Sequence, residues 1–589
     1  GFGLRWNVSE RVQVFTHPLW MLLVSAAYAL TRDVYYTSLA LSIALSFATA
    51  VLLARGIAVS EALQLFGVGL LALSKAFVDY STSGLENPLT HFLLALFAWA
   101  LFRGKSFRML ASIAGLLALN RMDSLLLVLP ALLVCGLRQP LGRAVKDVLA
   151  GFLPFLLWIV FSVVYYGFPF PNTAYAKLST GIPASDLVAQ GLLYLLNSLA
   201  MDPVTLFVIL LGLVVPVALR VPWARSFGVG ILLFLVYTVR IGGDFMSGRF
   251  LTGAFLLSVV LLTRLPLEIP GEGLTLAFAP LLLMGLPGLM AGLTGPAPAA
   301  SSSLVDPNGI ADERLFYAPK AGLLTIRRGE RVPPSDSAAE GVEARMKGPS
   351  VVVGGNGMFG FFAGPDVHVI DVNALGEPLL ARLPAKRGWR IGHFVRAVPA
   401  GYVRDLRGKE GRIDDPKLTA YDDELRLVTS GDLLSAARWG AIFDLNLGSA
   451  GHLLDDYFRI HSRLQRVALH DVSDPRPEGS DSAVGCIPFS DHGISVSLGG
   501  VSHASILETS LENNEPYVVI ALNHGELVFR QKVPVAKPPS ESLALHRLSV
   551  DPRAARMGYD EIRIFPETGE DEYALGHLRV VEEPLEGRP

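Results

Sequence analysis

Cysteine is scarce in this chain, with two residues among 589. Cys135 lies in an apolar run and Cys486 in a polar segment, so a disulfide between them is not expected. Neither has a neighbour at metal-ligand spacing. The sequence therefore gives no disulfide framework and no cysteine-based metal centre, and both thiols are interpreted as structural or incidental.

Charge is also scarce. Charged residues make up 17% of the chain, hydrophobic residues make up 51%, and the net charge is -3. This balance is too apolar for an ordinary soluble protein of this size, and it offers no basic footprint for a phosphate backbone. The composition excludes a soluble single-domain enzyme, a disordered chain and a nucleic-acid binder.

The few charges are unevenly distributed. The first 300 residues contain 18 Lys and Arg and 12 Asp and Glu, whereas the last 289 contain 32 and 41. The first density is typical of a polytopic membrane bundle and the second of a soluble domain. We predict a polytopic α-helical membrane bundle followed by an extracytoplasmic part, divided into a bundle (1–295), a Pro/Ala/Ser-rich linker (296–307), a mixed α/β domain (308–485) and a β-sandwich (486–589).

Apolar stretches that approach the length of a membrane span, about 17–25 residues, recur along the first part of the chain. They lie near residues 36–54, 59–77, 89–102, 107–120, 123–137, 147–166, 203–219, 226–241, 247–263 and 273–293. Residues 18–30 and 187–200 are apolar but too short or too polar to count as full spans.

Basic loops indicate the orientation, because cytoplasmic loops carry an excess of Lys and Arg. Arg55 and the loops 103–108, 138–146 and 220–225 are assigned to the cytoplasmic side. Strict alternation then places the following on the opposite side: loops 78–89, 120–123, 167–187 and 241–249, and everything after about residue 295.

The non-cytoplasmic loops hold unusual polar residues. Ionisable groups at membrane depth are costly and usually line a cavity or pair with one another, so we expect these loops to share one cavity. The candidates are Glu86, Arg121, Asp123, Asn172, Tyr175, Lys177, Arg240, Asp244 and Arg249.

Each candidate also has a structural interpretation. Glu86 precedes the head of a span and suits an acidic helix N-terminus, while Arg121 and Asp123 could close a loop as an ion pair. The aromatic and proline residues of segment 168–177 suit a membrane-interface belt, although Lys177 with Asn172 could instead hold a phosphate or a sugar. Asp244 follows two glycines and lies between two arginines, so it could orient a hydroxyl, help clamp a phosphate or pin two helices.

A glycine motif stands in the polar half. Residues 355–360 match the dinucleotide-binding pattern after an apolar strand, but a lone match is weak and the next acid, Asp371, comes too early. We interpret it as a tight strand-to-helix turn. Strands are expected at 323–326, 350–353 and 367–370, helices at 339–347 and 431–441, and sandwich strands from Cys486 onward. The sandwich could hold an acceptor glycan or serve as a packing lid.

The ordered set of motifs resembles a known family. The set comprises segment 7–12 (Asn-Val-Ser-Glu-Arg-Val), segment 16–20 with His17, Ser83-Gly84-Leu85-Glu86, Arg121-Met122-Asp123, segment 171–177 and Gly242-Gly243-Asp244. It is similar to the bacterial terminal arabinofuranosyltransferase-like family of the glycosyltransferase C superfamily, over roughly residues 1–300.

This resemblance implies a multi-pass enzyme of the bacterial inner membrane. Such an enzyme moves a sugar, here arabinofuranose, from a polyprenyl-phosphate donor such as decaprenyl-phosphate arabinose to a cell-wall glycan or glycoprotein on the periplasmic side, with inversion. No cofactor and no metal is required for the chemistry. Lys177, Arg240 and Arg249 would meet the donor phosphate, and Glu86, Asp123 and Asp244 would orient sugar hydroxyls or the acceptor.

The resemblance places the catalytic base in an acidic pair just after a first span. The chain begins immediately after where that pair would stand, so the base is expected upstream of Gly1, and neither Glu10 nor Asp33 is given its role. Two other functions fit the same features. A transporter or flippase for a lipid-linked sugar would need no catalytic acid, and an envelope scaffold would bind a partner through its polar half.

Overall fold

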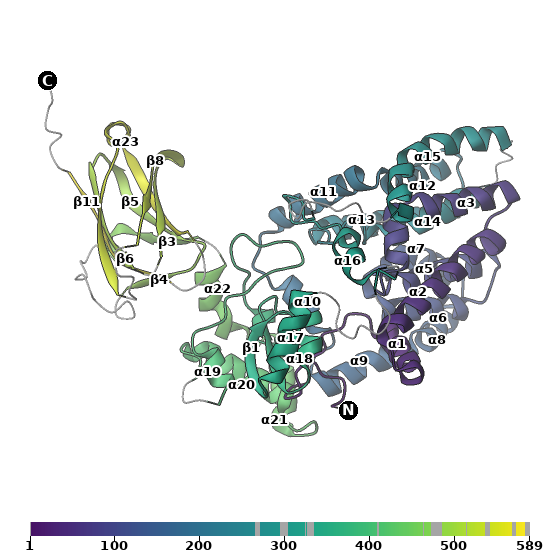
Figure 1. The fold of residues 1–589 in the computed structure, drawn as a ribbon, viewed down its shortest axis with the longest axis horizontal. Helices are drawn as coiled ribbons and strands as arrows, with labels where there is room; N and C mark the ends of the chain where they lie inside the picture. The colour runs from purple at the N-terminus through teal and green to yellow at the C-terminus, as the bar shows by residue number, and fades with distance from the viewer. Residues whose placement is uncertain are drawn as a thin grey trace.

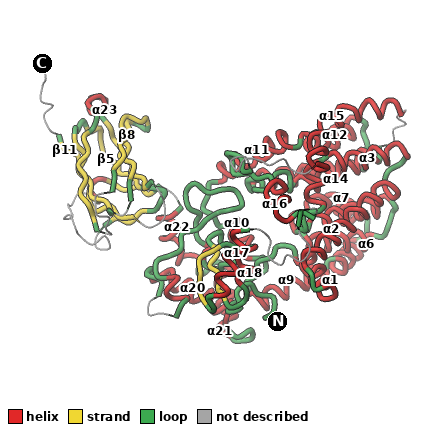
Figure 2. Tube along the Cα trace, in the orientation of Figure 1, coloured by secondary structure: helices red, strands yellow, loops and turns green. Residues whose placement is uncertain are grey.

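A computed structural model describes residues 2–265, 271–294, 304–323, 325–326, 335–408, 412–462, 464–472, 486–513, 515–535, 542–567 and 573–582. Figure 1 shows three parts along the chain: a helical region, a mixed α/β part beside it, and a β-sandwich that carries the C-terminus. The colouring in Figure 2 makes the change from helix to strand plain.

The helical region surrounds a helix that is buried along its whole length. This helix is α14 (Leu251–Thr263), and apolar residues on all its faces suit a central position. The other helices of this region are α1 (Pro18–Thr31), α2 (Val34–Val51), η1 (Leu52–Ile57), α3 (Glu61–Leu73), α4 (Lys75–Ser81), α5 (Asn87–Phe102), α6 (Phe107–Asn120), η2 (Met122–Ser124), α7 (Leu125–Leu137), α8 (Leu141–Gly151), α9 (Leu153–Tyr166), α11 (Ala184–Met201), α12 (Pro203–Ala218), α13 (Ala224–Arg240) and α15 (Gly271–Thr294). The short helix α10 (Asn172–Leu178) instead packs in the α/β part, where Ala176 joins the core (Figure 1).

Among the described residues, one continuous helical segment, Val34–Ile57, is long and apolar enough to cross a bilayer. The number rises to four if each of three bent pairs forms a single span: α3 with α4 (79°), α8 with α9 (58°) and α11 with α12 (110°). Several further apolar helices have 10–17 residues. The stretches predicted at 59–77 and 147–166 are therefore broken helices. The two stretches that we did not count as full spans, 18–30 and 187–200, form α1 and α11.

The α/β part contains one parallel strand pair. Its strands, β1 (Ser350–Gly354) and β2 (Val367–Asp371), pair with Val352 opposite Val369 and are joined through α18 (Met358–Ala363). Gly357, at φ +80°, makes the expected strand-to-helix turn. The remaining helices are α16 (Glu313–Ala321), α17 (Asp336–Met346), η4 (Leu380–Arg382), α19 (Tyr402–Leu406), α20 (Pro416–Ser430), α21 (Ala436–Leu447), η5 (Gly451–Leu454) and α22 (Asp455–His461).

Two further details concern this part. Asp371 accepts hydrogen bonds from the Asn356 side chain and from the backbone N–H of Leu375, so it secures the loop after β2. The strand expected at 323–326 is absent, because the described residues there form turns and bends; Leu324 lies outside the described residues.

The sandwich is built from two sheets with strand orders β3-β5-β10-β7-β8 and β4-β11-β6-β9. Its core includes Phe489, Tyr517, Tyr559 and Tyr573. The elements are β3 (Gln465–Ala468), η6 (Leu469–Asp471), β4 (Ile487–Phe489), β5 (Ile494–Ser502), β6 (Ile506–Glu512), β7 (Tyr517–Asn523), β8 (Glu526–Val533), β9 (Leu543–Ser549), α23 (Pro552–Met557), β10 (Tyr559–Pro566) and β11 (Tyr573–Val581). The boundary expected at Cys486 is too late, because β3 pairs in parallel with β5 and extends this sheet.

Buried arginines fasten the α/β part to the end of α9. Arg438 on α21 is fully buried, and it donates hydrogen bonds to the carbonyl oxygens of Val164 (3.0 Å), Tyr165 (3.2 Å) and Val428 (2.8 Å). Arg11 donates to the same Tyr165 carbonyl at 3.2 Å. The last carbonyls of a helix lack partners within it, so these guanidinium groups satisfy them and join the two parts.

Candidate functional site

A buried carboxylate lies at one end of the helical region. Glu86 is 1% exposed and directly precedes α5, but its side chain makes no helix cap. It accepts hydrogen bonds from Arg121 Nη1 at 3.0 Å and from Arg249 Nη2 at 2.9 and 3.0 Å, and His17 Nε2 lies 3.2 Å from it. Glu86 thus occupies the expected N-cap position of α5, while its carboxylate pairs with the two arginines and makes no capping hydrogen bond.

Arg121 links this carboxylate to a second one. Its Nε and Nη2 donate to the two oxygens of Asp123 at 2.8 and 3.0 Å, and its guanidinium lies over the ring of Phe250, 4.3 Å from the ring centroid. Arg121 directly follows α6, and Asp123 lies in η2. Every face of the guanidinium is thus engaged, which fixes its position between the two acids.

The loop between α13 and α14 supplies the other two charged groups. Gly242 and Gly243 both have positive φ, and a Cβ at Gly243 would lie 2.5 Å from the ring of Tyr194, so this turn requires glycine. Asp244 is 2% exposed, and its Oδ2 lies 3.5 Å from Arg249 Nη1. Backbone hydrogen bonds to Ala311 hold the loop from the other side.

This loop leaves two buried polar atoms without hydrogen-bond partners: Asp244 Oδ2 and Arg249 Nε. Asp244 Oδ1, in contrast, accepts the backbone N–H of Phe245 at 2.9 Å. Buried polar atoms are normally hydrogen-bonded, and an unsatisfied one is costly. An acceptor and a donor left side by side are suited to a ligand that carries a hydroxyl and an anionic oxygen.

Electrostatic interactions keep Glu86 ionised beside Arg121 and Arg249, whereas the imidazole of His17 is neutral at pH 7. Burial alone would raise the pKa of Glu86, but Arg249, His17 and Arg121 hold it well below its usual range. Burial, with the two arginines, lowers the pKa of His17 to about 4 against the opposing effect of Glu86.

The structure gathers some of the predicted residues and separates others. His17, Glu86, Arg121, Asp123, Asp244 and Arg249 form one cluster, called here the Glu86 cluster. Lys177, exposed on α10, is within electrostatic reach of Asp244, Arg249, Arg121 and Asp123. Charged residues of three of the four predicted loops thus meet in the structure, while a shared cavity, the side of the membrane and the binding roles of these residues stay predictions.

Three predicted residues lie outside this cluster. Asn172 donates to the backbone carbonyl oxygens of Ala374 (3.0 Å) and Glu377 (3.2 Å), so it ties α10 to the α/β part. Tyr175 packs against Arg382, 4.6 Å from guanidinium carbon to ring centroid. Arg240 is exposed at the end of α13, and Arg249 rather than Arg240 pairs with Asp244.

One acid near the cluster was not predicted. Burial, followed by the negative charge of Asp244, raises the pKa of Glu313 on α16 to about 7. Neighbouring residues attach this helix to the helical region, because Arg314 donates to Asp79 at 2.9 Å and Lys75 lies 2.9 Å from Asp312. Glu313 stands in the charge-rich half of the sequence, where a single acid gives no signal.

We expect Glu313 to make the protein less stable as pH rises. A carboxyl group whose pKa is raised on folding favours the folded state at low pH, and that contribution is lost as pH rises from about 4.5 through about 7. A Glu313→Gln variant should match wild type at pH 5 and unfold at a higher temperature than wild type at pH 8. Thermal unfolding across this range measures the difference; a constant difference would contradict the shifted pKa.

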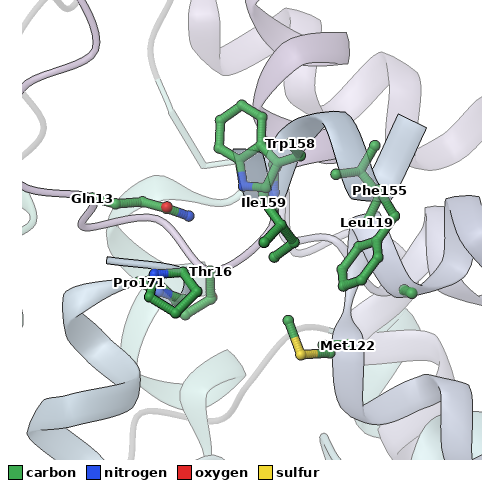
Figure 3. Close-up of a pocket in the computed structure, with 11 residues that line it drawn as sticks. Gln13, Thr16, Leu119, Met122, Phe155, Trp158, Ile159 and Pro171 are labelled. Carbon is green, nitrogen blue, oxygen red and sulfur yellow. The ribbon is translucent and has the colours of Figure 1, made fainter. Parts of the chain in front are cut away.

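Figure 3 shows a pocket that is lined mainly by apolar side chains. Leu119 and Met122, which flank Arg121 in the sequence, contribute to its wall together with Phe155, Trp158 and Ile159 of α9. Thr16, the neighbour of His17, and two prolines before α10 complete the wall together with Gln13, Pro18 and Ala118. The cavity is small, about 20 Å³, and its wall includes sequence neighbours of two cluster residues, His17 and Arg121.

The fold and the site together define an apolar helical region with a cluster of buried charged residues at one end, followed by an α/β part and a β-sandwich. The sequence is similar to the terminal β-(1→2)-arabinofuranosyltransferase of Mycobacterium tuberculosis, with 28% identity over an alignment that covers 74% of this chain and 86% of the relative. This similarity confirms the resemblance to the bacterial terminal arabinofuranosyltransferase-like family. No protein-family profile and no solved structure matches the chain.

Proposed function

We propose that this protein is a membrane glycosyltransferase that moves a sugar, arabinofuranose, from a polyprenyl-phosphate donor to an extracytoplasmic glycan or glycoprotein acceptor. The observation that carries this proposal is the Glu86 cluster, in which Asp244 Oδ2 is ion-paired with Arg249 but accepts no hydrogen bond, together with the apolar side chains next to it in sequence. The similarity to an arabinofuranosyltransferase supports the choice of sugar.

Each part of the proposed donor has a chemical match. The apolar side chains of Phe155, Trp158 and Ile159 suit contact with the polyprenyl chain. The phosphate suits Lys177, which is exposed near the cluster, and the unpartnered N–H of Arg249. Sugar hydroxyls suit Asp244 Oδ2, which can accept a hydrogen bond without breaking one.

In the proposed reaction an acceptor hydroxyl attacks the anomeric carbon from the face opposite the phosphate. The bond between that carbon and the phosphate oxygen breaks, polyprenyl phosphate leaves, and a carboxylate base takes the hydroxyl proton, which gives inversion. We assign this base to none of the residues in the chain. The Glu86 cluster fixes its charges before the substrate arrives, so its contribution is orientation and charge stabilisation.

The proposed orientation places the Glu86 cluster and the polar half outside the cytoplasm. Basic loops at 103–108, 138–146 and 220–225 support this placement, because they alternate with the loops that form the cluster. The α/β part contacts the helical region through Arg438 and Asn172, so it would lie on the same outer side. We propose a multi-pass protein of the bacterial inner membrane.

Replacing Asp244 with asparagine should lower the rate of transfer by roughly 10²-fold, as expected when one oriented group at a reacting centre is lost. The variant should remain folded, because asparagine keeps the shape and Oδ1 of the side chain. The assay uses membranes that contain the natural full-length protein, a labelled polyprenyl-phosphate sugar and an acceptor.

Asp33→Asn is a matched control for this experiment. Asp33 is an exposed carboxylate that caps α2, and asparagine caps helices equally well, so transfer should remain at the wild-type rate. Wild-type transfer by Asp244→Asn would remove Asp244 from the site. Movement of the lipid-linked sugar across the membrane without any transfer would favour a flippase.

A further inference from the structure

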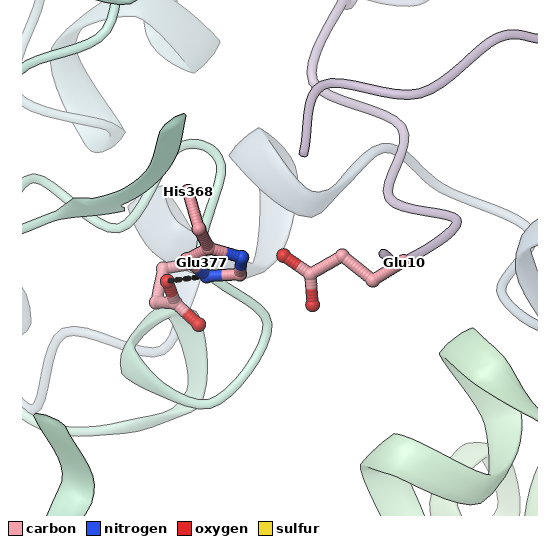
Figure 4. Close-up of side chains that lie close together, drawn as sticks. All are labelled: Glu10, His368 and Glu377. Carbon is pink, nitrogen blue, oxygen red and sulfur yellow. Dashed lines mark ion pairs between the residues drawn. The ribbon is translucent and has the colours of Figure 1, made fainter. Parts of the chain in front are cut away.

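We propose that Glu10, His368 and Glu377 form a binding site for one divalent transition-metal ion, separate from the Glu86 cluster. Among the described residues these three side chains each offer one ligand atom, and the three atoms lie within 4.8 Å of one another. Figure 4 shows the carboxylate of Glu10 and the imidazole of His368 directed toward each other, with Glu377 beside the ring.

The ligand atoms come from parts of the chain that are far apart. Glu10 belongs to the segment before α1, His368 to β2, and Glu377 to the loop after β2. Asn7 holds the first of these in place, because its side chain exchanges hydrogen bonds with the backbone of Val369 and donates to Glu10 Oε1 at 3.0 Å. The ligands are therefore fixed by backbone contacts and not by chance proximity on a surface.

One buried oxygen in the site lacks a hydrogen-bond partner. Glu377 is 1% exposed; its Oε1 accepts a hydrogen bond from Tyr402, but its Oε2 accepts none and lies 4.0 Å from His368 Nε2. Buried carboxylates are normally paired or coordinate a metal. The free oxygen faces the imidazole, where an ion between the two atoms would satisfy both.

His368 presents Nε2 on the side of Glu377. Ser9 Oγ lies 3.2 Å from Nδ1 and can accept a hydrogen bond from it, while Asn7 Nδ2 lies 3.3 Å from Nε2. An outer hydrogen bond such as that to Ser9 orients the metal-binding histidines of known sites. A bound ion would take the place of the Asn7 contact at Nε2.

Among the described residues, neither carboxylate forms an ion pair with a lysine or an arginine. Arg426 is within electrostatic reach of Glu10, but it donates to Asp422 at 2.6 Å and to Asp405 at 2.8 Å. A bound cation would balance the charge of the two carboxylates.

The donor set selects the type of ion. One imidazole and two carboxylates suit Zn²⁺ or Mn²⁺ better than Ca²⁺ or Mg²⁺, which prefer all-oxygen ligands. Bonds of about 2.1 Å hold ligand atoms roughly 3.0–3.5 Å apart, so side-chain adjustments of about 1 Å would close the set. Partly exposed His368 provides the route from solvent, since its side chain is 16% exposed.

Such an ion would fasten the segment before α1 to the α/β part. Glu10 is seven residues from His17, which contacts Glu86. The ion is thus assigned a positioning role: it would fix the approach of this segment to the Glu86 cluster, and it touches none of the groups that we assign to the sugar donor.

The test uses the natural full-length protein in detergent, freed of metal with EDTA and then given one equivalent of Zn²⁺ or Mn²⁺. We expect about one ion per chain by elemental analysis after desalting, and a higher thermal unfolding midpoint. His368→Gln and Glu377→Gln should lose both effects. His524→Gln is the control, because His524 lies 3.1 Å from one carboxylate, Asp560, on the exposed surface and belongs to no three-ligand group.

A second measurement uses the wild-type protein, so it still tests the site if the variants fail to fold. The electron paramagnetic resonance spectrum of Mn²⁺ added to metal-free wild type should change from that of the hydrated ion at one equivalent, and Zn²⁺ should restore it by displacement. No retained ion in wild type, or equal retention in wild type, His368→Gln and His524→Gln, would overturn the proposal and leave a proton-sharing cluster. Neither readout depends on sugar transfer.

Discussion

Replacing Glu86 with alanine should abolish transfer and lower the free energy of unfolding by about 3–5 kcal/mol, the range for removal of one partner from a buried ion pair. The reason is that this buried carboxylate is paired with two arginines. Arg121 and Arg249 both donate to it, and both guanidinium groups are nearly buried, with side chains 9% and 11% exposed. The variant would leave them with Asp123 and Asp244 only.

The Glu86→Gln variant separates the loss of transfer from the loss of stability. Glutamine keeps the shape and one acceptor oxygen, so stability should fall less than in the alanine variant, while loss of the charge still shifts both arginines and reduces transfer. Glu61→Ala is the control, since Glu61 is exposed in the first turn of α3. Chemical unfolding of the three variants gives the comparison. If Glu86→Ala were as stable as wild type, the ion pairs of Glu86 would not stabilise the fold.

Replacing Arg438 with methionine should loosen the α/β part from the helical region. The guanidinium donates to the carbonyl oxygens of Val164, Tyr165, Val428 and Leu433. Methionine would remove this donor from all four, and Arg11 would still donate to those of Tyr165 and Val428. At about 1–3 kcal/mol for each unsatisfied group, we expect a loss of at least about 2 kcal/mol in stability from Val164 and Leu433, with transfer lost as well.

Limited proteolysis measures this loosening. Cleavage in the α/β part should become faster in Arg438→Met, while Arg553→Met, at an exposed position on α23, should cleave like wild type. Equal cleavage of all three proteins would show that Arg438 does not hold the two parts together.

The Glu86 cluster could be predicted because charge is rare in the helical half. Where apolar residues dominate, each acid or base must pair or line a polar site. Assigning successive loops to alternate sides of the membrane was therefore enough to predict that one set of charged residues lies together: Glu86, Arg121, Asp123, Asp244 and Arg249. The same reasoning failed for Asn172. An amide can satisfy backbone groups across an interface, and the sequence does not show where that interface lies.

Other features depend on contacts that no local pattern reveals. Glu10 and Glu377 are 367 positions apart and meet only after the segment before α1 folds against β2. Glu313 stands among many charges, and its position beside Asp244 depends on how the loop after α13 pairs with residues near Ala311. The early start of the sandwich was missed because β3 has only four residues.

Donor consumption by the natural full-length protein tests the central proposal most directly. Membranes that contain the protein would be supplied with radiolabelled polyprenyl-phosphate arabinofuranose and an arabinose-containing glycan acceptor. We predict that label moves to the acceptor, that polyprenyl phosphate accumulates in equal amount, and that Asp244→Asn reduces both roughly 10²-fold while Asp33→Asn does not. Label that stays on the lipid, or transfer that proceeds unchanged in Asp244→Asn, would contradict a sugar-transfer site at the Glu86 cluster.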